Sequence, residues 1–133
     1  MSADGPPPDL RDHLALALVP GLGPKLTRAA IDHFGSPAAV LAASAARLET
    51  VPMIGPKLAQ QFAAAFPKVP VAEEWRRVVA HGVRVALHGS AEYPERLTTI
   101  FDAPPLIYLR GGFTEADTRA VAIVGSRHCT AYG

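Results

Sequence analysis

The chain of 133 residues has room for one ordinary domain and the start of a second. Hydrophobic residues make up 49% of it and charged residues 19%, a balance that excludes a wholly disordered chain and allows a buried core. The formal net charge is only +1, with Lys and Arg spread among carboxylates. Bulk attraction to a polyanion is therefore weak, and any contact with nucleic acid must be local.

The single cysteine, Cys129, excludes an intrachain disulfide and a cysteine-rich metal site. The five histidines are scattered without the spacing of metal ligands, so we expect neither a metal nor a cofactor. No apolar run approaches the roughly 20 residues that cross a bilayer, and the N-terminus lacks the features of a signal peptide. A cytoplasmic protein is the expectation.

The N-terminal half contains an internal repeat. Residues 1–8 form a Gly/Pro-rich tail that we expect to be disordered, and Asp9 is expected to cap a helix that runs to about Leu18. The segment VPGLGPKL at 19–26 then recurs 32 positions later as VPMIGPKL at 51–58, identical at six of eight places. This is a duplication, and it organises the whole half.

The repeated unit is typical of a helix-hairpin-helix. In both copies one proline ends the preceding helix, and a second proline stands at the first position of the next helix. In the first copy, Gly21 and Gly23 permit backbone angles that a Cβ would forbid. Between the copies, Ser36-Pro37 and Ser44 predict caps of one or two short helices.

A glycine turn before a helix directs free amide groups outward, and the helix dipole favours an anion there. Gly21, Gly23, Lys25 and Lys57 are therefore candidate DNA-phosphate contacts that would read no sequence. In the second copy Met53 replaces the first glycine, so a phosphate can approach the backbone of that hairpin less closely. The simpler interpretation, which we favour, is that both turns only join packed helices of a bundle.

After the second hairpin, the spacing of apolar residues predicts one more helix, in which Trp75 is expected to be a buried anchor. Near Gly82 the spacing of apolar residues changes from that of a helix to the strict alternation of a strand. We expect a helical domain over 9–82 and the beginning of an α/β domain over 83–133. The elements expected after Trp75 are a strand at 83–88, a short helix at 93–100, a strand at 106–109, a helical turn at 115–118 and a strand at 120–124.

The last expected strand leads into Gly125, Ser126 and Arg127. A small residue, a hydroxyl and a guanidinium at the end of a buried strand are a favourable place to hold a phosphate. One alternative is a nucleotide-binding hydrolase, but residues 125–128 depart from the G-x-G-x-x-G pattern at its third position. Another alternative takes the helical half as a domain that recruits a protein partner.

Three segments resemble the DNA-processing protein A family, called DprA or Smf. Tyr93-Pro94 followed by DAPPLIYLRG at 102–111 is similar to one family motif. VAIVGSR at 121–127, with Thr130 and Tyr132-Gly133, is similar to another. The doubled hairpin resembles the family's N-terminal helical domain, which is sterile-alpha-motif-like.

The resemblance implies a mostly α chain, in which a SAM-like helical bundle precedes the truncated start of a Rossmann-like α/β domain. It implies a non-enzymatic recombination mediator of natural transformation, or competence, that binds and protects single-stranded DNA, helps load RecA and forms a homodimer. It places Gly125, Ser126 and Arg127 on the loop that the family uses at its DNA pocket. Because the chain stops at Gly133, we expect an N-terminal fragment in which residues 120–133 are poorly ordered or pair with another copy.

Overall fold

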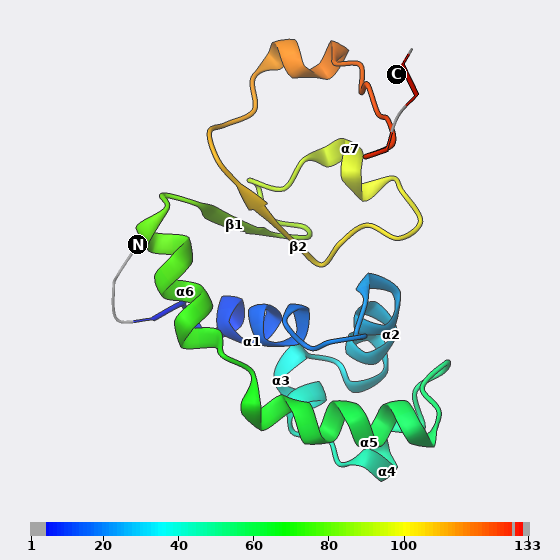
Figure 1. Cartoon of the computed structure of the whole chain (residues 1–133). Coiled ribbons are helices and arrows are strands. Elements are labelled where there is room, and N and C mark those ends of the chain that lie inside the picture. Colours follow the sequence, from blue (N-terminus) through cyan, green and yellow to red (C-terminus); the bar gives the residue numbers. More distant parts are fainter. Residues whose placement is uncertain (1–4, 129, 132–133) are drawn as a thin grey trace.

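The computed structural model describes residues 5–128 and 130–131, which are mostly helical with a small sheet towards the C-terminal end (Figure 1). Among them, no helix has both the length and the apolar character that a bilayer crossing needs. The helical elements up to residue 80 are α1 (Pro8–Ala17), α2 (Pro24–Phe34), α3 (Pro37–Leu41), α4 (Ala45–Leu48), α5 (Pro56–Ala65), the 3-10 turn η1 (Phe66–Lys68) and α6 (Val71–Ala80). They are followed by β1 (Arg84–Leu87), α7 (Glu95–Thr98), β2 (Leu106–Leu109) and the 3-10 turn η2 (Glu115–Arg119).

The internal repeat forms two hairpins of the same shape. Both α2 and α5 begin with a proline, whose fixed φ suits the first helical position. In each hairpin a buried apolar residue donates its N–H to the carbonyl three residues earlier, at 3.1 Å, from Leu22 to Val19 and from Ile54 to Val51. The duplicated helix-hairpin-helix is confirmed.

The two copies pack against each other. Gln61 on α5 donates from Nε2 to the carbonyl oxygen of Pro20 in the first hairpin, at 3.4 Å. The fully buried Phe62 lies beneath Gly21, where an added Cβ would be 3.8 Å from its ring. Both contacts belong to one core whose fully buried members besides Phe62 are Leu16, Ala30, Val40, Leu48 and Ala59.

The short helices between the hairpins begin where the sequence predicted. Ser36 and Ser44 each accept a hydrogen bond at the side-chain Oγ from the backbone N–H three residues ahead, at 3.2 and 3.4 Å. The predicted cap of α1 is wrong, because the helix already starts at Pro8 and Asp9 lies in its first turn. Proline suits the first helical position, so the helix begins before the residue that was expected to cap it.

The sheet is formed by β1 and β2, which pair antiparallel from Arg84 opposite Leu109 to Leu87 opposite Leu106. It packs on α1 and α6, as Figure 1 shows. A second core joins these elements and consists of Leu14, Trp75, Val78 and Leu106. The helical part and the sheet therefore share buried side chains on both sides of Gly82.

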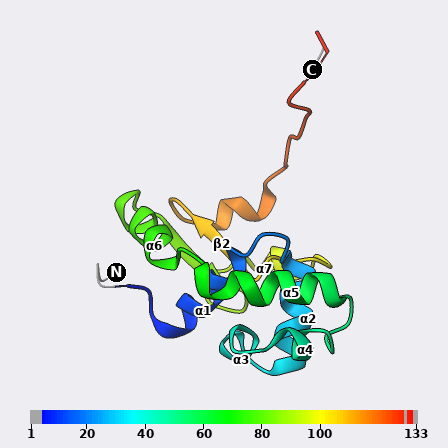
Figure 2. The same ribbon diagram turned by 60° about the horizontal axis from the view of Figure 1, so that its bottom comes forward.

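The strand predicted at 120–124 is absent. These residues have no regular structure, and Ile123 is 96% exposed. A strand needs a neighbour that satisfies its backbone groups, and in the described part of the chain β1 and β2 pair only with each other. Figure 2 shows the C-terminal segment extending away from the helices. The helical turn before it is confirmed as η2.

Candidate nucleic-acid interface

The first hairpin has a backbone that an anion could approach. Gly21 has φ +82°, in the left-handed region that glycine adopts without strain. Gly23 is the N-cap of α2 and has no side chain with which to accept a hydrogen bond from the first-turn amides. Because residues 20, 21 and 23–25 are exposed, this end of α2 presents its amides and its positive dipole to solvent.

The second hairpin has a similar backbone conformation, but Met53 stands where the first hairpin has Gly21. Met53 has φ +71° and is about half exposed, so its side chain stands at the turn where Gly21 leaves space in the first copy. Gly55 caps α5 as Gly23 caps α2, and Lys57 is exposed. The second hairpin therefore offers the charge of Lys57 with a more obstructed backbone.

Lys25 has a neighbour that no local sequence signal indicated. Its Nζ lies 5.6 Å from the centroid of the Phe101 ring, in a cation–π contact. One helical turn further, Arg28 donates from Nη2 to the carbonyl oxygen of Ala103, at 3.1 Å. The loop between α7 and β2 thus lies against α2, although 75 positions separate Arg28 from Ala103.

This loop is fixed to the sheet by the Tyr-Pro segment. Tyr93 is 5% exposed, and its hydroxyl donates to the carbonyl oxygen of Pro104 at 2.8 Å. Burial raises the pKa of the Tyr93 phenol, and the positive charge of Arg28 acts in the opposite direction. The N–H of His88 donates to the carbonyl oxygen of Pro105, also at 2.8 Å. The Tyr93-Pro94 and 102–111 parts of the first motif therefore contact each other here.

The predicted site at Gly125, Ser126 and Arg127 lies in the exposed C-terminal segment. The backbone N–H of His128 donates to Ser126 Oγ at 3.2 Å, a contact within the segment. Figures 1 and 2 both place this segment away from α2 and α5. The structure therefore does not bring these three residues together with the hairpin lysines.

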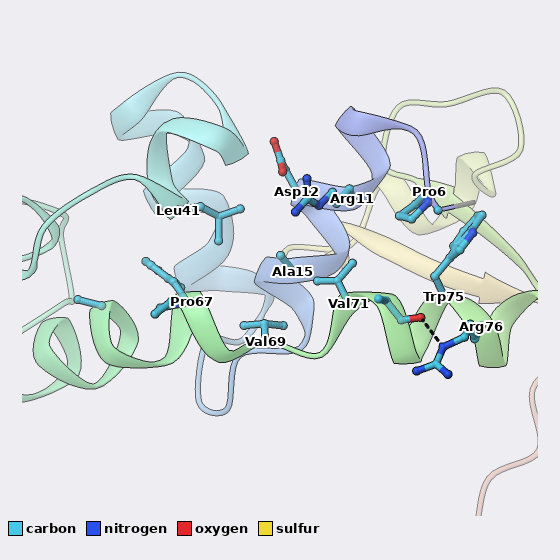
Figure 3. A pocket seen from close by; sticks show the side chains of 14 residues that line it. Pro6, Arg11, Asp12, Ala15, Leu41, Pro67, Val69, Val71, Trp75 and Arg76 are labelled. Atoms are coloured by element: carbon cyan, nitrogen blue, oxygen red, sulfur yellow. Dashed lines mark hydrogen bonds between the residues drawn. The ribbon is translucent and has the colours of Figure 1, made fainter. Parts of the chain in front are cut away.

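A groove of about 860 Å³ lies between α1, α3 and α6, and none of the predicted DNA contacts lines it (Figure 3). Its wall combines apolar side chains, such as Leu41 and Val69, with the charged side chains of Arg11, Asp12 and Arg76. Leu41 and Trp75 lie towards opposite ends of the groove. Pro6 of the N-terminal tail lies near Trp75 at one end. The groove is separate from the hairpins.

Comparison with protein families gives two matches that divide the chain. Residues 14–65 match the SAM-like helix-hairpin-helix tandem. Residues 84–133 match the family of DNA recombination-mediator protein A. The C-terminal part of the chain is therefore similar to DNA recombination-mediator protein A. Searches of curated proteins and of solved structures each gave no match.

The segment that matches DNA recombination-mediator protein A and the segment that matches the helix-hairpin-helix tandem are in direct contact. The former contains Tyr93, Phe101 and residues 125–127, whereas the latter contains Lys25 and Arg28. The contacts of Lys25 with Phe101 and of Arg28 with Ala103 join the two. Tyr132 and Gly133, which complete the second motif, lie outside the described residues, as does Cys129.

Proposed function

We propose that this protein binds single-stranded DNA and acts in the cytoplasm as a non-enzymatic recombination mediator of natural transformation. In this role it protects incoming DNA from nucleases, helps load RecA, and works as a homodimer. The observation that carries the proposal is the match of residues 84–133 to DNA recombination-mediator protein A, a stretch that includes residues 125–127. The helix-hairpin-helix tandem at 14–65 supports DNA as the ligand.

The chemistry of residues 125–127 suits a DNA strand. Nothing lies within 4 Å of the place where a Cβ of Gly125 would stand, so a phosphate has room to approach the backbone. Ser126 has a hydroxyl that donates a hydrogen bond, and Arg127 has a planar, forked cation that pairs with phosphate or stacks on a base. These contacts do not depend on base identity.

The hairpins supply further contacts in this proposal. Gly21, Gly23 and Lys25 offer backbone amides and a positive charge to a phosphate, and Lys57 adds a charge at the second hairpin. Such contacts position a strand without reading its sequence. Binding is therefore expected to weaken as salt concentration rises.

The test of the site is a fluorescence-anisotropy titration of the full chain with a labelled oligothymidylate. Arg127→Ala is expected to weaken binding about tenfold or more, because a hydrogen bond to a charged group contributes about 1.5–3 kcal/mol. It is also expected to lower the slope of log affinity against log salt by about one.

Arg119→Ala is the matched control, since Arg119 is an exposed arginine of the same C-terminal region. It should leave the affinity within about twofold of wild type. Equal affinities for wild type and Arg127→Ala would refute the site. Absence of any binding by the wild-type chain would refute the proposed function for these residues.

A further inference from the structure

Phe101 is the most exposed aromatic side chain of the described residues, at 83%. It lies in the loop between α7 and β2, which Figure 1 shows beside α2. Burying a phenylalanine ring normally gains about 1.5–3 kcal/mol, so an aromatic ring left in solvent forgoes a large stabilisation. A ring in this position is available to a ligand.

The loop that holds Phe101 is fixed at several points. Ala103, two residues further on, is 1% exposed, and its carbonyl accepts the hydrogen bond from Arg28. The next carbonyl, of Pro104, accepts the hydroxyl of Tyr93. A ring carried by an anchored loop loses little freedom when a ligand stacks on it, which favours binding.

A cation stands beside this ring. Lys25 Nζ is 5.6 Å from the centroid of Phe101, so the ammonium group covers part of one ring face. Because the side chain is 83% exposed, the rest of the ring stays open to solvent. An open aromatic face with an adjacent ammonium matches the two parts of a nucleotide, a flat base and a phosphate.

We propose that Phe101 and Lys25 form a stacking site for single-stranded nucleic acid, in which a base packs on the ring and its phosphate pairs with the ammonium. The site is shared by the first hairpin and the segment that matches DNA recombination-mediator protein A, so it spans the contact between them. It rests on the proposed single-stranded-DNA function and deepens it, since it adds a second binding point remote from residues 125–127.

The charged residues next to Phe101 affect where a phosphate can lie. Asp102 is exposed and adjoins Phe101, so its carboxylate repels a phosphate on its own side. Lys25 and Arg28 lie on the side of α2. We therefore expect the phosphate to pair with Lys25 and not to approach Asp102, and Asp102→Asn to strengthen binding about twofold.

The first experiment compares single substitutions in the full chain, titrated with an oligothymidylate. Phe101→Ala is expected to weaken binding about tenfold, since one stacked base contributes about 1–3 kcal/mol. Lys25→Ala is expected to weaken it severalfold and to lower the salt slope by about one. The matched controls are Phe113→Ala, which removes another exposed aromatic, and Lys68→Ala, which removes an exposed lysine that belongs to none of the proposed contacts.

The second experiment detects stacking directly. In Phe101→Trp, the indole replaces an exposed ring, whereas the native Trp75 is 2% exposed and gives a constant background. Oligothymidylate is expected to quench the added fluorescence, and an abasic oligomer of the same length is not, because it carries phosphates without bases. Phe113→Trp is the control and should respond to neither.

Each outcome decides between the proposals. If wild type binds and depends on Arg127, while Phe101→Ala binds equally well and Phe101→Trp is not quenched, the stacking site is wrong and the proposed function stands. If Phe101→Ala and Phe113→Ala weaken binding alike, the ring has no special role and the stacking site is again wrong. If the wild-type chain binds no oligonucleotide, both proposals fail.

Discussion

Met53 occupies the position that Gly21 holds in the first hairpin, and the two residues have nearly the same φ, +71° and +82°. The left-handed region costs a residue with a Cβ about 1–2 kcal/mol, whereas glycine adopts it freely. The second hairpin therefore keeps its shape under strain. Burial of Val51 and Ile54 on either side of Met53 holds the turn in place.

This strain predicts that Met53→Gly raises the free energy of unfolding by about 0.5–1 kcal/mol. The gain is smaller than the strain because glycine also stabilises the unfolded chain through its greater entropy. Conversely, Gly21→Ala is expected to lower the free energy of unfolding by about 1 kcal/mol. Urea denaturation followed by circular dichroism measures both changes.

Gly23→Ala is the control for these substitutions. Gly23 has φ −73°, and an added Cβ would meet no atom within 4 Å. The poorer N-cap and the lower entropy of the unfolded chain offset each other, so the change should stay within about 0.5 kcal/mol. A Met53→Gly variant no more stable than wild type would show that the turn stores no strain.

At the scale of the element, α3 illustrates how a five-residue helix persists. Such a helix is too short to be stable alone. Its N-cap Ser36 satisfies one amide, and the fully buried Val40 anchors it in the first core. The capping hydrogen bond and the burial of Val40 together stabilise a helix that is too short to form alone.

Ser36→Ala is expected to lower the free energy of unfolding by about 1 kcal/mol, because it leaves the amide at the start of α3 without its acceptor. Ser36→Asp keeps an acceptor and adds a favourable charge at the helix N-terminus, so it should be at least as stable as wild type. Thermal denaturation of the three proteins tests this. Equal melting temperatures for Ser36→Ala and wild type would rule out a stabilising cap.

At the scale of the whole molecule, the second core joins the helical part to the sheet. Leu14 of α1 and Trp75 of α6 meet Leu106 of β2, and all three are buried. The contacts of Arg28 and Lys25 with the loop at 101–103 add a second connection. We expect the helical part and the sheet to unfold together.

Leu106→Ala tests this coupling. It is expected to lower the free energy of unfolding by about 2–5 kcal/mol, because it empties space between α1, α6 and the sheet. Trp75, the only tryptophan, reports on this junction by fluorescence, and circular dichroism reports on the helices. Both transitions should shift to lower urea together. If only the fluorescence transition moved, the two halves would be independent.

The sequence alone determined the helical part, because its signals are local. The repeat, the prolines at the starts of α2 and α5, and the serine caps of α3 and α4 each act within a few residues. The strands β1 and β2 were also predictable from alternation and flanking turns. The match of residues 84–133 follows from contiguous motifs.

Only the tertiary structure decided the rest, because it depends on residues far apart in the chain. An apolar run such as 120–124 becomes a strand only beside a partner, and in the described residues it has none. The pairing of Lys25 with Phe101, and of Arg28 with the loop that carries it, required two segments about 75 positions apart to meet. Local patterns predicted most of the helices and the two paired strands, and long-range packing placed an exposed aromatic ring beside a hairpin lysine.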